Sequence, residues 1–85
     1  MKIRAFELED AEAVSSLIGT PEYNVPNVLW FAGRENIYVA KIGKKIVGVG
    51  SIKNGQIHML YVARQERGTG VDIELTSFLE RIIQN

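Results

Sequence analysis

The fold is decided by the stretch Leu60-Tyr61-Val62-Ala63-Arg64-Gln65-Glu66-Arg67-Gly68-Thr69-Gly70-Val71, in which a β-forming run passes through a glycine loop into a helix. The helix is predicted because apolar residues then recur every three or four positions: Val71, Leu75, Phe78, Leu79 and Ile82. A helix that begins this way leaves backbone N–H groups unpaired at its positive end, and glycines let a phosphate approach them. The stretch therefore predicts an anion site, although the same glycines also suit a simple turn before a helix.

Upstream of this stretch, three β-forming runs predict antiparallel strands: Ile37 to Ile42, Ile46 to Ile52 and Gln56 to Val62. The first two are joined by the turn Gly43-Lys44-Lys45, and the last two by Asn54-Gly55, the strongest short signal for a type I′ hairpin. Gly48 and Gly50 lie inside the middle strand, which indicates a bulge or a close backbone approach there.

The N-terminal part predicts one strand, Lys2 to Phe6, with Ile3 on its buried side. A helix follows, entered through acidic residues, with the apolar stripe Ala11, Val14, Leu17 and Ile18 and a stop at Gly19. The segment from Thr20 to Glu35 is rich in Pro, Asn and Gly and is interpreted as a loop with one short helical turn. We thus expect a single domain, residues 1–85, of mixed α/β class with mainly antiparallel strands and two main helices.

Composition excludes several classes of function. The formal net charge is zero and basic residues are scattered, so neither nucleic acid nor an anionic membrane is an expected partner. There is no cysteine and only one histidine, which argues against thiol chemistry and against a metal site. The N-terminus has no apolar signal region, and no apolar run approaches membrane-spanning length. The expected location is the cytoplasm.

The stretch from Leu60 to Val71 resembles the signature of the GNAT family of N-acetyltransferases: a strand end L-x-V, four connecting residues, then R-G-x-G-[IV]. Ile3-Arg4, Asp10 and Ile46-Val47-Gly48 also occupy places similar to those in the family. The resemblance extends over essentially the whole chain, and its specific part is Arg67 to Gly70. It implies a GNAT fold, truncated after the strand–loop–helix unit that binds the pyrophosphate of acetyl-CoA.

The resemblance also implies which residues hold acetyl-CoA or CoA. The end of the fourth strand would pair with the pantetheine arm, and the glycine loop with the start of the helix would bind the pyrophosphate. Carried over by position, the implied residues are Leu60, Tyr61 and Val62 for the arm, and Arg67, Gly68, Thr69, Gly70 and Val71 for the pyrophosphate. Thr69 would add a hydroxyl hydrogen bond, and Arg67 a charge-assisted contact.

One departure from the family pattern concerns charge. Gln65-Glu66-Arg67-Gly68-Thr69-Gly70 satisfies the pattern Q/R-x-x-G-x-G/A, but the spacing from the strand end favours a register that starts at Arg67. In that register the last small residue is Asp72. A carboxylate there is ordinary for a first helical turn, yet beside a pyrophosphate it would repel the ligand by about 2–4 kcal/mol at an effective dielectric near 20.

A second departure concerns length, because a complete GNAT domain continues with a fifth strand, a further helix and a closing pair of strands. Without them, Gln56 to Val62 becomes an apolar sheet edge of the kind that finds partners. We therefore expect a homodimer, or a partner protein bound along this edge. Two functions stay open. In the first, the chain binds acyl-CoA and transfers acetyl to an amine, but only when a partner chain completes the cleft. In the second, it is a non-catalytic interaction or regulatory module derived from the family.

The sequence identifies no catalytic residue beyond one option, His58. Strand alternation predicts that His58 shares a face with Leu60 and Val62, while Tyr61 lies on the opposite face and packs. Imidazole is a common general base, which would suit deprotonation of an amine, but a lone strand histidine is more often a surface residue.

Overall fold

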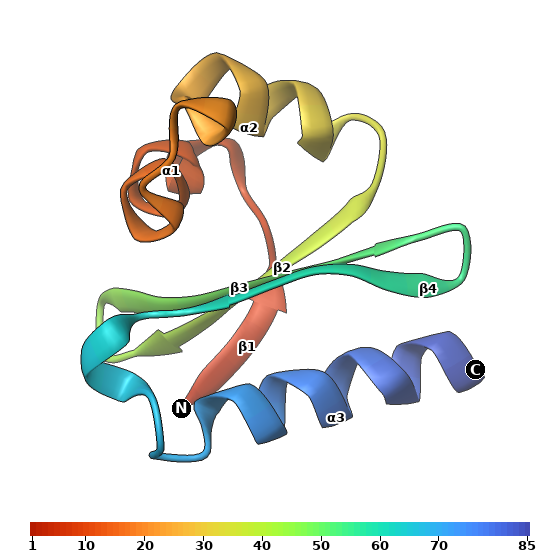
Figure 1. The fold of residues 1–85 in the computed structure, drawn as a ribbon. Coiled ribbons are helices and arrows are strands. Elements are labelled where there is room, and N and C mark those ends of the chain that lie inside the picture. The colour runs from red at the N-terminus through yellow and green to blue at the C-terminus, as the bar shows by residue number, and fades with distance from the viewer.

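The computed structural model describes all 85 residues and shows a four-stranded antiparallel sheet covered by helices on both faces (Figure 1). The strands are β1 (Lys2–Ala5), β2 (Asn36–Ile42), β3 (Lys45–Lys53) and β4 (Gln56–Val62), and the helices are α1 (Ala11–Ile18), α2 (Val25–Ala32) and α3 (Val71–Gln84). Short 3-10 turns occupy Leu8–Asp10, Pro21–Tyr23 and Arg64–Glu66. The strand order is β1-β2-β3-β4, so β1 and β4 are the sheet edges. The predicted mixed α/β class is confirmed.

The segment between α1 and β2 is more ordered than the sequence predicts. Instead of a loop with one short turn, residues Val25–Ala32 form the eight-residue helix α2, so the fold has three helices rather than two main ones. Asn24 caps it, since its side-chain oxygen accepts from the Asn27 N–H at 2.9 Å. Pro26 lies in the first turn, where a missing N–H costs nothing. The residues interpreted as helix breakers are in fact those that start a helix.

The sheet separates two apolar clusters, one on each face. The cluster between the sheet and α1 and α2 contains Ala11, Val14, Ile18, Val28, Ile37, Val39, Val49 and Met59. The cluster between the sheet and α3 contains Ala40, Val47, Ile52, Ala63, Val71, Leu75 and Leu79, with Ile3 packed against it as predicted. None of the helices is long and apolar enough to cross a membrane.

Two register shifts interrupt the alternation of the sheet. In β3, Val47 is an extra residue between the pairs Ala40↔Gly48 and Lys41↔Ile46. In β4, His58 is an extra residue between the pairs Ser51↔Met59 and Ile52↔Ile57. A bulge of this kind re-aims the inserted side chain and bends the strand.

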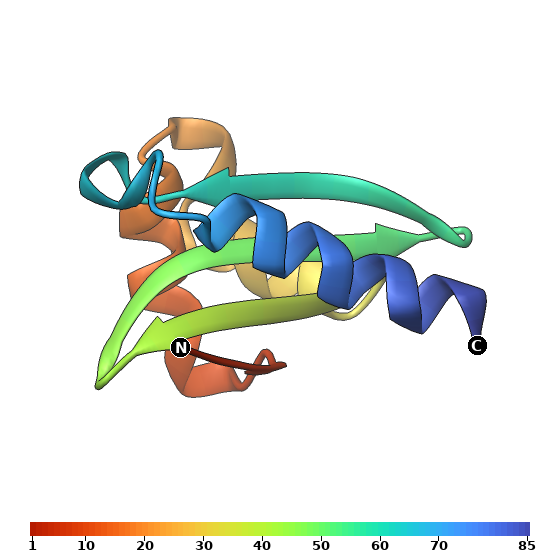
Figure 2. The same ribbon diagram turned by 90° about the horizontal axis from the view of Figure 1, so that it is seen from below.

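The predicted close approach at the interior glycines of β3 is confirmed. A Cβ on Gly50 would lie 2.7 Å from Leu79 Cδ1, and one on Gly48 would lie 3.4 Å from Leu75 Cδ2. Leu75 and Leu79 are fully buried, so these two glycines form the surface on which α3 rests. Figure 2 shows α3 lying diagonally across β3 and starting beside the C-terminal end of β4.

Replacing Gly50 with alanine should therefore destabilise the fold, because the new methyl group overlaps Leu79. We expect the free energy of unfolding to fall by about 1–3 kcal/mol, the usual range for overpacking, measured by urea denaturation. Gly33→Ala is the matched control, since its Cβ would come no closer than 3.6 Å to the Trp30 carbonyl oxygen and its φ is negative. An equal effect in the two variants would contradict this account of the packing.

The first strand is tied to the first helix by a charged pair. Arg4 donates two hydrogen bonds to Asp10, at 2.7 and 3.0 Å, and the Glu7 N–H donates to the same carboxylate at 2.8 Å. Asp10 is 5% exposed. The hydrogen bond from Arg4 is the main cause that holds the pKa of Asp10 below its usual value.

This lowered pKa makes stability depend on pH. The folded pKa of Asp10 lies below the unfolded value near 3.9, so its contribution is present above about pH 4 and is lost as the pH falls through the folded pKa. We expect Asp10→Asn to lower the free energy of unfolding at pH 7 and to have a smaller effect at pH 3. Glu12→Gln, an exposed acid in the first turn of α1, should show no such dependence. If Asp10→Asn lowers the free energy of unfolding equally at pH 7 and pH 3, the carboxylate of Asp10 is not the cause of the pH dependence.

Candidate acyl-CoA site

A groove of about 470 Å³ lies along the open edge of β4 and reaches the start of α3. Its lining residues are Leu60, Tyr61, Val62, Arg67, Gly68 and Asp72. The fold thus brings together the strand end and the glycine loop that the sequence singles out. Three other predicted residues do not line it: Thr69 is exposed in the loop, Gly70 is the N-cap of α3, and Val71 is buried in the core.

The backbone at the end of β4 has unpaired groups on its open side. The Ala63 N–H donates to the Val47 carbonyl at 2.8 Å, and the pairing continues as Val62↔Gly48, Tyr61↔Val49 and Leu60↔Gly50. Hydrogen-bonded pairs alternate with non-bonded pairs in an antiparallel ladder. Tyr61 therefore bonds to β3, whereas the backbone groups of Leu60 and Val62 point to the open edge.

The loop and the helix start present a cluster of free donors. Within the loop, the N–H groups of Arg67 and Thr69 are bonded to carbonyls three residues earlier. Within α3, the first bonded N–H is that of Glu74, which donates to Gly70 at 3.0 Å. From Gly68 to Ile73, five backbone N–H groups have no acceptor in the protein: those of Gly68, Gly70, Val71, Asp72 and Ile73. Together with the positive end of the α3 dipole, they are the candidate site for an anion.

A model of the acetyltransferase (GNAT) domain matches residues 8–85 of the chain. The chain belongs to the GNAT family. A comparison with curated proteins gave no match.

Solved structures of GNAT-like fold superpose on the whole chain. The smu.2055 protein of Streptococcus mutans UA159 matches with a TM-score of 0.89 and 24% identity, over 100% of this chain and 67% of that one. A ribosomal-protein-alanine N-acetyltransferase from Brucella melitensis matches with a TM-score of 0.82 and 19% identity, over 99% of this chain and 67% of that one. Rv2747 from Mycobacterium tuberculosis, solved in complex with CoA, matches with a TM-score of 0.80 and 20% identity, over 99% of this chain and 58% of that one. The chain therefore has the GNAT fold and spans about two thirds of these chains or less.

The side chains around the free donors carry opposite charges. Arg67 lines the groove and forms no ion pair within the chain. Asp72 lines the same groove from the first turn of α3, in the place that counting from the strand end gives it. The Thr69 hydroxyl, predicted to reach the pyrophosphate, donates instead to the Glu66 carbonyl at 2.6 Å and closes the loop. In this GNAT domain the groove thus presents free backbone N–H groups, one cationic side chain, Arg67, and one carboxylate, Asp72.

His58 does not lie where alternation predicts. Val62 packs against the α3 cluster, whereas the bulge at His58 breaks the alternation on which the prediction rested. The His58 Nδ1 lies 3.0 Å from Glu35 Oε1, just before β2. The His58 side chain is 43% exposed and that of Glu35 only 2%. Sequence reasoning missed Glu35, because no local pattern links residues 23 positions apart.

Aromatic rings border this end of the edge strand. Tyr61 packs edge-on against Tyr23, with ring centres 6.1 Å apart, and Tyr23 lies 5.3 Å from Phe31. Tyr61 is therefore a packing residue of the face that carries α1 and α2, as expected. Burial, followed by the nearby Tyr61, raises the pKa of Tyr23. Tyr23 thus stays a neutral phenol across the physiological range.

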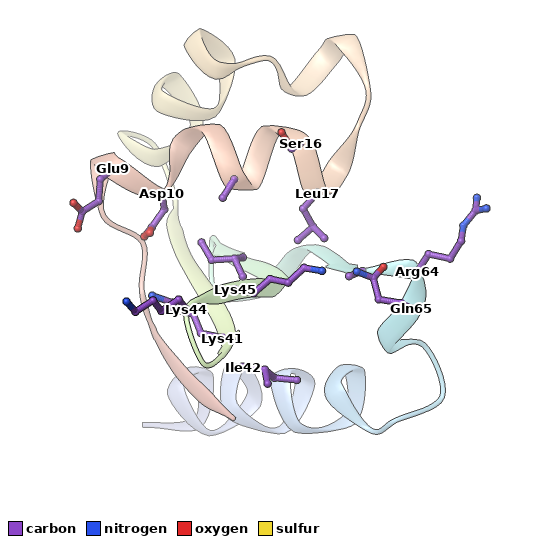
Figure 3. A pocket seen from close by; sticks show the side chains of 13 residues that line it. Glu9, Asp10, Ser16, Leu17, Lys41, Ile42, Lys44, Lys45, Arg64 and Gln65 are labelled. Atoms are coloured by element: carbon purple, nitrogen blue, oxygen red, sulfur yellow. The ribbon is translucent and has the colours of Figure 1, made fainter.

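The largest hollow of the molecule lies elsewhere, between α1 and the β2–β3 turn (Figure 3). It measures about 960 Å³ and is bordered by Lys41, Lys44 and Lys45 over an apolar floor that includes Leu17 and Ile46. Lys45 extends along the cleft toward Gln65, while the Arg64 side chain points away from it (Figure 3). None of the residues predicted to bind CoA lines this cleft. No group of three or more His, Asp or Glu side chains that could hold a metal ion occurs in the structure.

Proposed function

We propose that the chain is an acetyl-CoA-dependent N-acetyltransferase-like protein that binds acyl-CoA along β4 and the α3 N-terminus. The observation that carries this proposal is the set of five free N–H groups directly beyond an open strand edge. A pyrophosphate needs several donors around one point, and a pantetheine arm needs extended backbone to pair with. The groove supplies both at adjoining places, and membership of the GNAT family supports the assignment.

In the proposed reaction the acetyl group passes directly from the thioester to an amine. The amine loses a proton and attacks the thioester carbonyl, the C–N bond forms, and the C–S bond breaks to release CoA. Backbone N–H groups near Leu60 and Val62 would polarise the carbonyl, since they point to the open edge. This is a preorganised arrangement, because β3 holds the strand through the intervening residues.

We also propose that catalysis needs a second wall, supplied by another copy of the chain or by a partner protein. Within these 85 residues, β4 has no neighbour on its outer side. Leu60 and Tyr61 are each 37% exposed there. A two-fold partner placed against these side chains, without pairing with the backbone of Leu60 and Val62, would cover both and would enclose the groove.

The alternative is a non-catalytic GNAT-derived module, and Asp72 is the observation that favours it. A carboxylate in the groove competes with a pyrophosphate for the same N–H groups. The strength of CoA binding decides between the two functions.

Binding of CoA should raise the melting temperature in proportion to its affinity. We expect a shift with millimolar CoA or acetyl-CoA in a thermal titration. Asp72→Asn should strengthen binding by about tenfold or more by removing the repulsion. Glu74→Gln is the control, because it removes an equal charge from the same helical turn but faces a different hollow, near Met1.

Two results would count against these assignments. An unchanged melting temperature at millimolar CoA would contradict the acyl-CoA proposal. If Asp72→Asn and Glu74→Gln increase the affinity for CoA equally, the effect comes from the total charge of the helix start and not from a carboxylate in the groove.

The edge proposal predicts self-association that depends on β4. Sedimentation at high micromolar concentration should show a dimer, and Leu60→Lys should shift it to monomer, because a charge on an apolar edge opposes association. Leu29→Lys is the matched control, since Leu29 is 39% exposed but lies on α2. A strict monomer in the wild type at this concentration would contradict the proposed homodimer.

A further inference from the structure

We propose that Glu35 is a positioning residue that holds His58 as the proton acceptor for the incoming amine. This inference rests on the proposed transferase function and adds a named role for a carboxylate that no sequence pattern marks. The starting observation is the contact of 3.0 Å between His58 Nδ1 and Glu35 Oε1, made across 23 positions of sequence.

The pair is costly for the fold, which suggests that packing alone does not explain it. Burying a carboxylate is unfavourable unless its oxygens are paired. The Glu35 side chain is 2% exposed, yet its second oxygen, Oε2, has no hydrogen-bond partner. The only other buried side-chain polar atom without a partner is Ser51 Oγ, and Ser51 lies opposite Met59, next to the bulge. The carboxylate that contacts His58 is therefore only half satisfied within the protein.

The bulge sets His58 apart from its neighbours in β4. An ordinary strand residue there would follow the alternation of its neighbours, whereas the extra residue turns the imidazole toward Glu35. His58 is two residues before Leu60, roughly 7 Å along the strand, and the Leu60 backbone faces the open edge where a thioester would lie. Nδ1 is directed at the buried carboxylate and the His58 side chain is 43% exposed, so the proposal assigns the role of proton acceptor to Nε2.

The direction of the hydrogen bond decides what His58 can do. If Glu35 is ionised, the His58 Nδ1–H donates to it, and Nε2 keeps a free lone pair that can accept a proton. If Glu35 is protonated, its O–H donates to Nδ1, and Nε2 carries a hydrogen that blocks this role. The proposal requires the first arrangement, in which the carboxylate also stabilises the imidazolium formed on proton transfer.

The proton balance follows from this arrangement. The acceptor arrives as an ammonium, and His58 Nε2 takes one of its protons. The freed amine attacks the thioester carbonyl carbon, the C–N bond forms, and the C–S bond breaks. The departing thiolate receives the second proton lost by the nitrogen, and His58 releases the first to solvent. The products are the amide, CoA thiol and one proton.

The first test uses the fact that His58 is the only histidine of the chain, so its signals need no assignment. The ring nitrogen shifts and the two-bond couplings from the ring carbons distinguish the two neutral tautomers in a ¹⁵N-labelled sample above neutral pH. We expect a protonated Nδ1 and an unprotonated Nε2 in the wild type, and a loss of this preference in Glu35→Leu. A protonated Nε2 in the wild type would overturn the proposal.

The second test separates positioning from structure. Glu35→Gln keeps the shape but removes the charge, and it should lower kcat for acetyl transfer by about tenfold or more while KM for acetyl-CoA stays unchanged. Release of CoA thiol would be followed with acetyl-CoA and a panel of alkyl and amino-acid primary amines. Glu22→Gln is the control, because Glu22 is an exposed acid near Tyr23 that makes no contact with His58.

The outcomes distinguish this inference from the proposed function. Absence of CoA binding refutes the proposed function, while the nitrogen shifts still report which tautomer Glu35 selects. CoA binding with an unchanged kcat in Glu35→Gln overturns the positioning role and leaves the transferase proposal intact. CoA binding without transfer to any amine of the panel, in a chain shown to be dimeric, overturns the role of His58 as proton acceptor.

Discussion

The contact between α3 and the two interior glycines of β3 is the constraint on which the candidate site depends. Leu75 and Leu79 pack where side chains would otherwise stand, so the helix lies close against the sheet. This closeness fixes the start of α3 beside the end of β4, where the first N–H groups of the helix have no intrahelical acceptor. Packing on one face of the sheet thus positions the candidate anion site at its edge.

Two features give the edge strand different chemistry at two places along it. Beyond the C-terminal end of β4, free N–H groups and Arg67 would favour a pyrophosphate in the proposed site, while Asp72 would oppose it. Toward the middle of the strand, the bulge turns His58 to a buried carboxylate. Between them lie the outward backbone groups of Leu60 and Val62. A thioester bound along this line would have its phosphates at one end and a proton acceptor at the other.

Most of the fold was accessible from the sequence because its signals are local. The spacing of apolar residues predicted the strands and α3. Asn54-Gly55 predicted the hairpin, and both residues have a positive φ there, 54° and 75°. The helix α2 was missed because Pro26 and Asn24 were interpreted as breakers, although the same residues suit a helix start. The bulge at His58 was missed because alternation is assumed until pairing is seen. Glu35 lacked any signal, since its role comes only from a tertiary contact.

The central claim is that backbone N–H groups at the start of α3 bind the pyrophosphate of acyl-CoA. Amide shifts from ¹H–¹⁵N spectra, recorded while CoA is titrated into the labelled protein, test it most directly. The account predicts that the largest changes fall on Gly68, Gly70, Val71, Asp72 and Ile73, since a phosphate oxygen would become their first acceptor. Changes that fall on Lys41, Lys44 and Lys45 instead, with these five amides unmoved, would contradict it.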